Sequence, residues 1–239
     1  MSTNLDNILA AARTQATELQ PLAGAPLPAV TPLGGSGGAV ASYNMSEDAF
    51  LNPGGMECDT YIQVKDAGIK LNKDWDGFLD DFEAIIDLQD VQYFMGIRKE
   101  VGSNVSYAKS YDGVSTSRGE NFAQVVEEFK RTSQKPADTY RGADIPMTLV
   151  GDYKDPKDKG TTKPRYTDGQ VVGLTTSITG FKPWANFARK LKNAGLGATQ
   201  IKIKIKVTHS PRRNAQGQAY GVCEFDVVEV LGGAAAQAA

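Results

Sequence analysis

The sequence has few of the residues from which metal and disulfide sites are built. Its 239 residues include a single histidine, His209, and two cysteines, Cys58 and Cys223. One histidine is too few for an ordinary zinc site of several His and Cys ligands, and two cysteines give no disulfide framework. We therefore expect no metal and no cofactor.

The sequence also gives no signature of a catalytic site. No Gly-x-x-x-x-Gly-Lys-Ser/Thr stretch occurs, which excludes a P-loop. Cys58 has acidic neighbours, which raise a thiol pKa, and Cys223 alternates as a core residue of a predicted strand. If their segment is a helix, Asp76, Asp80 and Glu83 share one face and could bind a metal ion. Exposed acids on an amphipathic element are, however, usually solvated rather than metal ligands. We expect a protein that is not an enzyme.

Long apolar runs are absent as well. No stretch of about 18 apolar residues is present, so we expect no helix that spans a membrane. The first residues lack the basic start and the apolar block of a secretory signal. Together with the few cysteines, these absences predict a reducing, cytoplasmic setting and no membrane partner.

Composition divides the chain into three parts. Residues 1–56 are rich in Ala, Pro and Gly, and such a segment buries too little apolar surface to offset its chain entropy. We expect a flexible arm there, which could contact another subunit of a homo-oligomer. One folded domain is predicted over residues 57–232, followed by a disordered tail over residues 233–239.

The spacing of apolar residues predicts a mainly β domain with two or three helices. Helices with one apolar stripe are expected at residues 119–133 and 182–197, and a third near residues 5–19. The stretch "FEAIIDL", residues 82–88, fits either a strand or a helix. Strands are expected in the segments 60–64, 91–100, 104–113, 144–154, 170–180, 198–210 and 217–230.

Charge is distributed unevenly, although the net charge is only −2. The 55 residues from Gly169 to Cys223 contain nine Lys or Arg and no Asp or Glu, whereas residues 47–90 contain twelve acids and three lysines. A long basic segment without acids suggests an anionic partner. Alternatively, the acidic and basic segments face each other within the fold.

Residues 201–230 form a predicted hairpin whose first strand alternates lysine with apolar residues. A turn centred near Asn214 would bring Lys204 and Lys206 roughly opposite Glu224 and Asp226. Cross-strand pairs of opposite charge stabilise sheets modestly. The lysines could therefore simply form a solvated face with internal pairs.

The tip of this hairpin carries two arginines with no acid near them in sequence. Arg212 and Arg213 lie there, flanked by His209 and Tyr220. An arginine can bind a phosphate through two hydrogen bonds or stack on a base. An aromatic ring can stack on a base, which contributes about 1–3 kcal/mol. The tip is thus a candidate for contact with nucleic acid.

Several stretches resemble bacteriophage single-stranded DNA-binding proteins. They are "SYAKSYDGV", "DIPMTLV", the helix that contains Trp184 and Phe187, and "VTHSPRRNAQGQAYGVCEFDVV", within roughly residues 90–230. A helix between the third and fourth strands, followed by two closing strands, is also the order of an OB-fold. The resemblance implies an OB-like five-stranded barrel with extensions. The chain departs from the family at its C-terminus, which lacks the acidic tail that recruits replication partners in many such proteins.

The resemblance implies sequence-tolerant binding of single-stranded DNA in phage DNA replication or recombination, in the cytoplasm of an infected bacterial cell. Phage replication or recombination proteins would be further partners. The expected phosphate-binding residues are Lys182, Arg189, Lys190, Lys192, Lys202, Lys204, Lys206, Arg212 and Arg213. The expected stacking residues are Tyr220 and, if their strand lies on the same face, Tyr107 and Tyr111.

Two other functions fit the same sequence. A virion structural or assembly protein would use the N-terminal arm to lace subunits together, and its uneven charge for contacts between subunits. An inhibitor that mimics DNA would present the acidic segment, with carboxylates spaced like phosphates. Assembly without nucleic acid favours the structural interpretation, whereas salt-sensitive binding to an oligonucleotide favours DNA binding.

Overall fold

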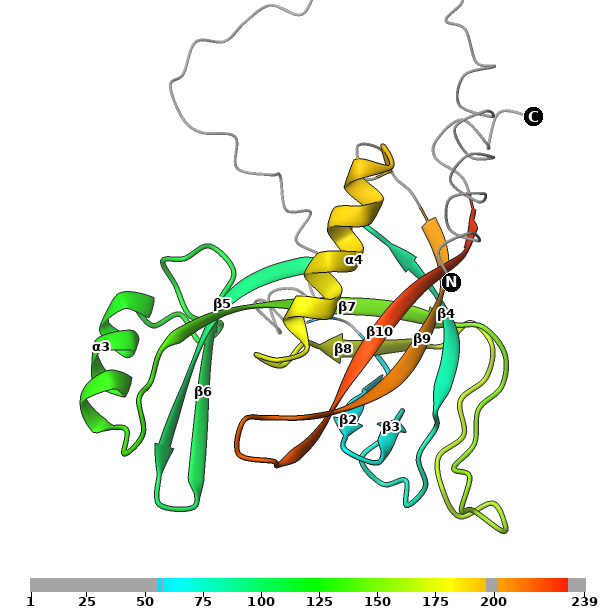
Figure 1. The fold of residues 1–239 in the computed structure, drawn as a ribbon, viewed down its shortest axis with the longest axis horizontal. Helices are drawn as coiled ribbons and strands as arrows, with labels where there is room; N and C mark the ends of the chain where they lie inside the picture. The colour runs from blue at the N-terminus through cyan, green and yellow to red at the C-terminus, as the bar shows by residue number, and fades with distance from the viewer. Residues whose placement is uncertain (1–55, 57, 197–201, 232–239) are drawn as a thin grey trace, which may run out of the picture. The chain divides into compact units, whose positions relative to one another are not determined.

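The structure is a computed structural model that describes residues 56, 58–196 and 202–231. The predicted arm except Met56, the predicted tail and the helix expected near residues 5–19 lie outside the described residues. All described residues belong to the unit Gly54–Ala239. As predicted, this part of the chain is mainly β and has two helices (Figure 1).

Ten strands and two helices make up the described part of the chain. In chain order they are β1 (Thr60–Tyr61), β2 (Gln63–Lys65), β3 (Gly68–Lys70), β4 (Asp81–Asp87), β5 (Gln92–Val101), β6 (Asn104–Ser110), α3 (Phe122–Thr132), β7 (Thr139–Leu149), β8 (Val171–Thr175), α4 (Phe181–Asn193), β9 (Lys202–Arg213) and β10 (Ala219–Val230). The expected strands and both expected helices in this region are confirmed, except that the strand expected over residues 60–64 is divided between β1 and β2, which belong to different sheets. Their ends differ most at β7, which begins at Thr139 rather than at Asp144.

The ambiguous stretch "FEAIIDL" forms strand β4. Every second residue of β4 is buried, and the strand pairs with β7 on one edge and with β9 on the other. A strand that is paired on both edges and buried on one face explains the alternation. The helical interpretation is wrong, and Asp76, Asp80 and Glu83 therefore do not share a helix face.

One eight-stranded sheet contains all strands except β2 and β3, which form a separate pair. Its main order is β1-β8-β7-β4-β9-β10, and β5 pairs with both β6 and β7. The first part of β7 pairs with β5, while its second part pairs with β8 and β4. β7 thus joins the β5–β6 hairpin, against which α3 packs, to the rest of the sheet (Figure 1).

This sheet is not closed into a barrel, which differs from the expected five-stranded barrel. Its order ends in β1 and β10, because β1 takes the free edge of β8 that a closed ring would need. β2 then lies against β10, where a Cβ atom on Gly221 would come within 1.9 Å of the Lys65 carbonyl oxygen. A cavity of about 110 Å³, lined in part by Val64, Leu174 and Val222, lies along this seam.

The two helices begin and end where the local sequence favours it. The Asn121 side chain accepts a hydrogen bond of 3.1 Å from the backbone N–H of Gln124 and caps α3. Pro183 lies in the first turn of α4, where its missing N–H costs no helical hydrogen bond. α4 ends at Asn193, and Gly195 follows shortly after with a positive φ of 81°, a conformation that favours glycine after a helix.

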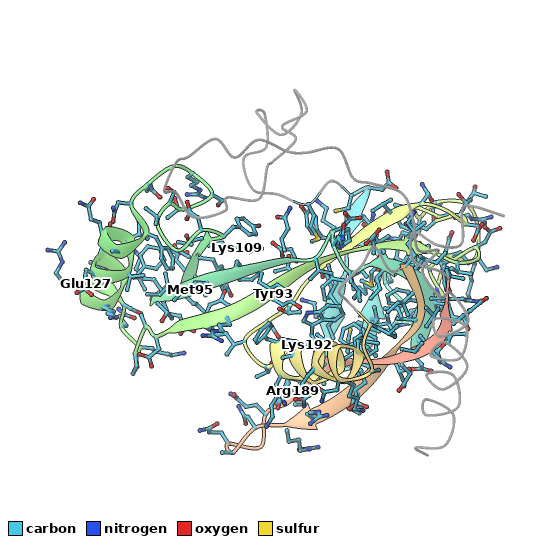
Figure 2. All side chains as sticks on the ribbon, turned by 90° about the horizontal axis from the view of Figure 1, so that it is seen from above. Tyr93, Met95, Lys109, Glu127, Arg189 and Lys192 are labelled. Atoms are coloured by element: carbon cyan, nitrogen blue, oxygen red, sulfur yellow. The ribbon has the colours of Figure 1, made fainter. Side chains whose placement is uncertain are left out.

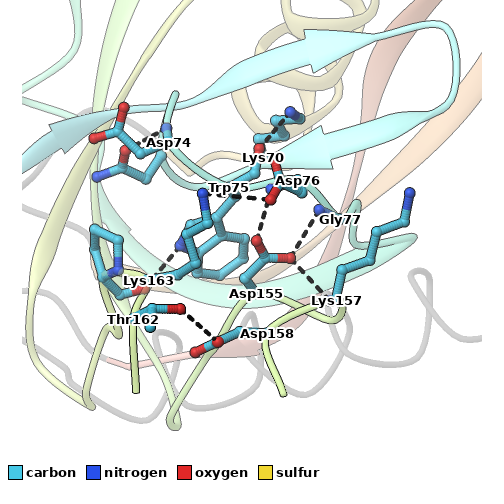
Figure 3. Close-up of polar contacts among 12 residues, drawn as sticks. Lys70, Asp74, Trp75, Asp76, Gly77, Asp155, Lys157, Asp158, Thr162 and Lys163 are labelled. Carbon is cyan, nitrogen blue, oxygen red and sulfur yellow. Dashed lines mark hydrogen bonds and ion pairs between the residues drawn. The ribbon is translucent and has the colours of Figure 1, made fainter. Parts of the chain in front are cut away.

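The charged loop between β7 and β8 is attached to the acidic segment that precedes β4 (Figure 3). The buried Asp155 carboxylate accepts hydrogen bonds from the backbone N–H groups of Asp76 (2.6 Å), Gly77 (2.7 Å) and Lys157 (2.9 Å). Burial alone would raise the pKa of Asp155, but these bonds outweigh it and lower that pKa. Lys163 also pairs with Asp76 at 3.3 Å. Hydrogen bonds and an ion pair with this loop therefore fix the position of part of the acidic segment.

A buried carboxylate ties the β5–β6 hairpin to the sheet. Asp144 is 1% exposed and lies where β7 changes its partner from β5 to β8. It accepts hydrogen bonds from the hydroxyls of Tyr111 and Thr175, each at 2.6 Å, and from the Lys109 ammonium group at 3.0 Å. The hydroxyl of Tyr111, one of the expected stacking residues, is therefore engaged within the fold.

We expect Asp144→Asn to lower the free energy of unfolding by about 2 kcal/mol, because the amide cannot neutralise the partly buried Lys109. Urea unfolding followed by tryptophan fluorescence measures the change. The control is Glu127→Gln, which removes an exposed pair with Lys130 of 3.5 Å and should cost about 0.5 kcal/mol or less. Equal small losses in both variants would contradict the role given to Asp144.

Candidate functional site

Helix α4 is anchored to β10 by three aromatic rings. The ring centroid of Phe225 on β10 lies 5.2 Å from that of Trp184 and 5.7 Å from that of Phe187. All three side chains are buried. Trp184 and Phe187 thus lie on the apolar face of α4, and Trp184 has no exposed surface on which a base could stack. This contact fixes the distance between α4 and the β9–β10 hairpin.

A groove of about 460 Å³ lies between α4 and the hairpin. Lys182 and Lys190 of α4, Arg212 of β9 and Tyr220 of β10 line it, and all four are residues expected at the site. Arg212 and Tyr220 are direct partners in the ladder, and the two lysines, eight residues apart, lie on one side of the helix. We call this the α4–β10 groove. Its volume falls in the range of about 300–1,000 Å³ that is usual for ligand sites.

Two carboxylates also line the α4–β10 groove. They belong to Glu224 and Asp226, so three cations and two acids leave a net charge of +1. Arg212 has no acid near it in sequence, but its Nη2 atom lies 2.7 Å from Oε1 of Glu224 across the hairpin. Both side chains of this pair are about half exposed, at 48% and 49%. Such a pair contributes only about 0–1 kcal/mol, so an incoming anion can replace Glu224 at little cost.

The lysines in the middle of β9 are paired with β4 rather than facing the groove. Lys204 Nζ lies 2.6 Å from Oε2 of Glu83, and Lys206 Nζ lies 3.0 Å from Oδ2 of Asp81. The hydrogen bond with Glu83 raises the pKa of Lys204. For this part of the chain, the alternative in which the acidic and basic segments face each other is confirmed.

The register of the hairpin differs from the expected one. Asp226 lies opposite Lys206 as expected, but Lys204 does not lie opposite Glu224. The turn is centred beyond Asn214, whose side chain accepts two backbone N–H hydrogen bonds from residues later in the turn. This later turn moves the second strand relative to the first.

Three other expected cations lie around the groove or away from it, and Figure 2 labels two of them, Arg189 and Lys192. Arg189 does not line the groove, but its Nη1 atom lies 3.5 Å from Oδ1 of the lining residue Asn186, so Arg189 lies at the rim. Lys190 faces the groove, and residues two apart on a helix do not share a face. Lys192 therefore points away from the groove. Arg213 donates a hydrogen bond of 3.3 Å to a backbone carbonyl within the hairpin turn.

The remaining expected residues are not brought to the groove. Lys202 lies at the far end of β9 from the tip, opposite Asp87 of β4. Tyr107 is 57% exposed on β6, where the Arg98 guanidinium lies 6.0 Å from its ring centroid. Tyr111 lies at the end of β6, next to the buried Asp144 cluster.

Some groove residues were not anticipated from the sequence. Asn186 lies one helical turn from both Lys182 and Lys190, and this spacing of four residues is a signal that could have found it. Glu224 and Asp226 carry no such signal, because their role depends on where α4 packs against β10. The acidic segment does not line the groove.

Metal and thiol chemistry have little support in the described part of the chain. Among residues 56, 58–196 and 202–231, no group of three or more His, Cys, Asp or Glu side chains could hold a metal ion. Burial raises the pKa of Cys58, and raises that of Cys223 to about 12, so neither thiol is activated. No described helix is long and apolar enough to cross a membrane.

Comparison with known proteins gives no match, whether with protein-family models, with curated proteins or with solved structures. The function therefore has to be argued from the α4–β10 groove itself.

Proposed function

We propose that the protein binds single-stranded DNA in the α4–β10 groove, without catalysis and without strong sequence preference. The observation that carries this proposal is the convergence of Lys182, Lys190 and Arg212 around the half-buried ring of Tyr220. These residues come from the three consecutive elements α4, β9 and β10, and the packing of α4 on β10 brings them together in one groove.

The chemistry of the groove suits an unpaired nucleotide. Ammonium and guanidinium groups bind phosphates regardless of base identity, and Arg212 offers a planar group that can bind a phosphate at two points. The Tyr220 ring can stack on any base that is exposed, because every base has a π-face. A duplex hides these faces within its stack, so a groove that relies on one ring favours single strands.

The two carboxylates of the groove moderate this attraction. Oε1 of Glu224 lies 2.7 Å from the Arg212 guanidinium, and an incoming phosphate would replace it there. Glu224 and Asp226 can also accept hydrogen bonds from the amino groups of bases. With Lys182, Lys190, Arg212 and the rim residue Arg189, about four phosphate contacts are within reach of one strand.

The order of elements supports an OB-like architecture as part of this proposal. α4 lies between β8 and β9, and the β9–β10 hairpin ends the described fold. OB-folds bind oligonucleotides with a strand face and with the loop between the last two strands, and Arg212 and Tyr220 lie at the ends of β9 and β10 that flank this loop. The β9–β10 hairpin and α4 resemble segments of bacteriophage single-stranded DNA-binding proteins, and the proposal of a role in phage DNA replication or recombination rests on this resemblance.

Fluorescence anisotropy of a labelled oligo-dT of about 30 nucleotides, titrated with the full chain at several salt concentrations, tests the function. Four contacts predict that log K falls against log [salt] with a slope of about −3. Duplex DNA of equal length is the control and should bind more weakly. Absence of binding at low salt would contradict the proposal. If the chain also assembled into oligomers without nucleic acid, a structural role would be favoured.

Two lysines on α4 offer a matched pair of variants. Lys190→Ala should weaken oligo-dT binding about fivefold and make the salt slope shallower by about 0.7, because one phosphate contact is lost. Lys192→Ala removes another exposed charge, two residues away on the opposite side of the helix, and should change neither quantity. Equal effects in the two variants would indicate a general electrostatic attraction rather than binding in the groove.

A further inference from the structure

A strip of the β5–β7 sheet is exposed although its side chains are aromatic, apolar or cationic. Alternation places Tyr93, Met95 and Ile97 of β5 on one face. Ile97 is buried in the cluster that packs against α3, whereas Tyr93 is 52% and Met95 is 41% exposed. Figure 2 shows Tyr93 and Met95 on the side of β5 that faces α4, with Lys109 on the other side. α3 therefore covers only one end of this face.

The strip reaches the start of α4, whose first turn also borders the α4–β10 groove. The ring of Tyr93 meets the ring of Phe181 edge-on, with 6.5 Å between the centroids. Phe181 is the first residue of α4 and precedes Lys182 of the groove. Ile178, which lines the same end of the groove, is 52% exposed. A ligand that leaves the groove at this end would meet Tyr93 next.

The strip also offers a cation. Arg141 of β7 is the direct cross-strand partner of Met95, so both side chains lie on the same face. Arg141 is exposed, and its guanidinium makes no ion pair or hydrogen bond with any described residue. The other direct partners on this face are Ala143 and Ser110, so no carboxylate is paired with Tyr93 or Met95. The exposed groups are those that contact bases and phosphates.

We propose that a single strand bound in the α4–β10 groove continues past the start of α4 onto this strip. Tyr93 is a second stacking platform there, Met95 packs against the adjacent base, and Arg141 binds a phosphate. Tyr93 and Met95 lie about 7 Å apart along the strand, so successive bases can meet them in turn. This inference rests on the proposed function and extends the length of strand that the site contacts.

Anisotropy titrations with two lengths of oligo-dT test the inference. A strand of about six nucleotides can be held by the groove alone, whereas one of about 20 nucleotides can also reach the strip. Tyr93→Ala should weaken binding of the longer strand about tenfold, the loss of one stacked base, and that of the shorter strand less than about twofold. Tyr93→Phe keeps the ring and should keep the wild-type affinity for both lengths.

Tyr107→Ala is the matched control. Tyr107 is similarly exposed, at 57%, but it pairs with Arg98 and so lies on the opposite face of the same sheet from Tyr93. Its removal should leave binding of both lengths unchanged. Two results would overturn the proposed role of the strip but not that of the groove, provided that the wild-type chain binds the long strand. Either Tyr93→Ala binds the long strand as tightly as the wild-type chain, or Tyr107→Ala loses as much affinity for it as Tyr93→Ala does.

The remaining outcomes also separate the two proposals. No binding of either strand by the wild-type chain would refute the proposed function and the strip with it. Self-association of the wild-type chain that disappears in Tyr93→Ala, with oligonucleotide binding unchanged, would assign the strip to a second copy of the chain and overturn the inference. Sedimentation velocity of both proteins distinguishes that case.

Discussion

The contact of Trp184 and Phe187 with Phe225 is the constraint on which the candidate site depends. Centroid distances of 5.2 and 5.7 Å dock α4 on β10 and leave the groove beside the contact. Each buried aromatic side chain contributes about 1.5–3 kcal/mol through apolar burial, and each ring pair adds about 0.5–1.5 kcal/mol. The groove is therefore a stable feature of the fold, formed before any ligand arrives.

The basic segment of the chain serves two different purposes. Lys204 and Lys206 pair with Glu83 and Asp81 of β4, so their charges are compensated within the sheet. The cations of α4 are exposed, and Lys182 and Lys190 face the groove. A count of charge along the sequence cannot separate these groups, because the acids that pair with the lysines come from a strand more than a hundred residues earlier. The groove is consequently less positive than the segment that builds it.

Local patterns predicted most of the elements but not their assembly. Single apolar stripes identified α3 and α4, and strict alternation identified β9 and β10, because each pattern matches the period of its element. The stretch "FEAIIDL" stayed ambiguous because its apolar residues fit both periods, and only pairing with β7 and β9 decides for a strand. Likewise, β1 pairs with β8 and β2 lies against β10, which leaves the sheet open. Both arrangements depend on contacts between segments that are distant in sequence. Four expected site residues meet in the groove, whereas Tyr107 and Tyr111 lie elsewhere for the same reason.

Photocrosslinking tests the central claim, that a single strand lies in the α4–β10 groove, most directly. An oligo-dT of about 20 nucleotides that carries 5-iodouracil would be crosslinked to the full chain, and the modified peptides identified by mass spectrometry. We predict crosslinks at Tyr220 and in the α4 segment 178–190, with few from a duplex of equal length. Crosslinks confined to residues 1–55 or 232–239, or none above the duplex control, would contradict the account.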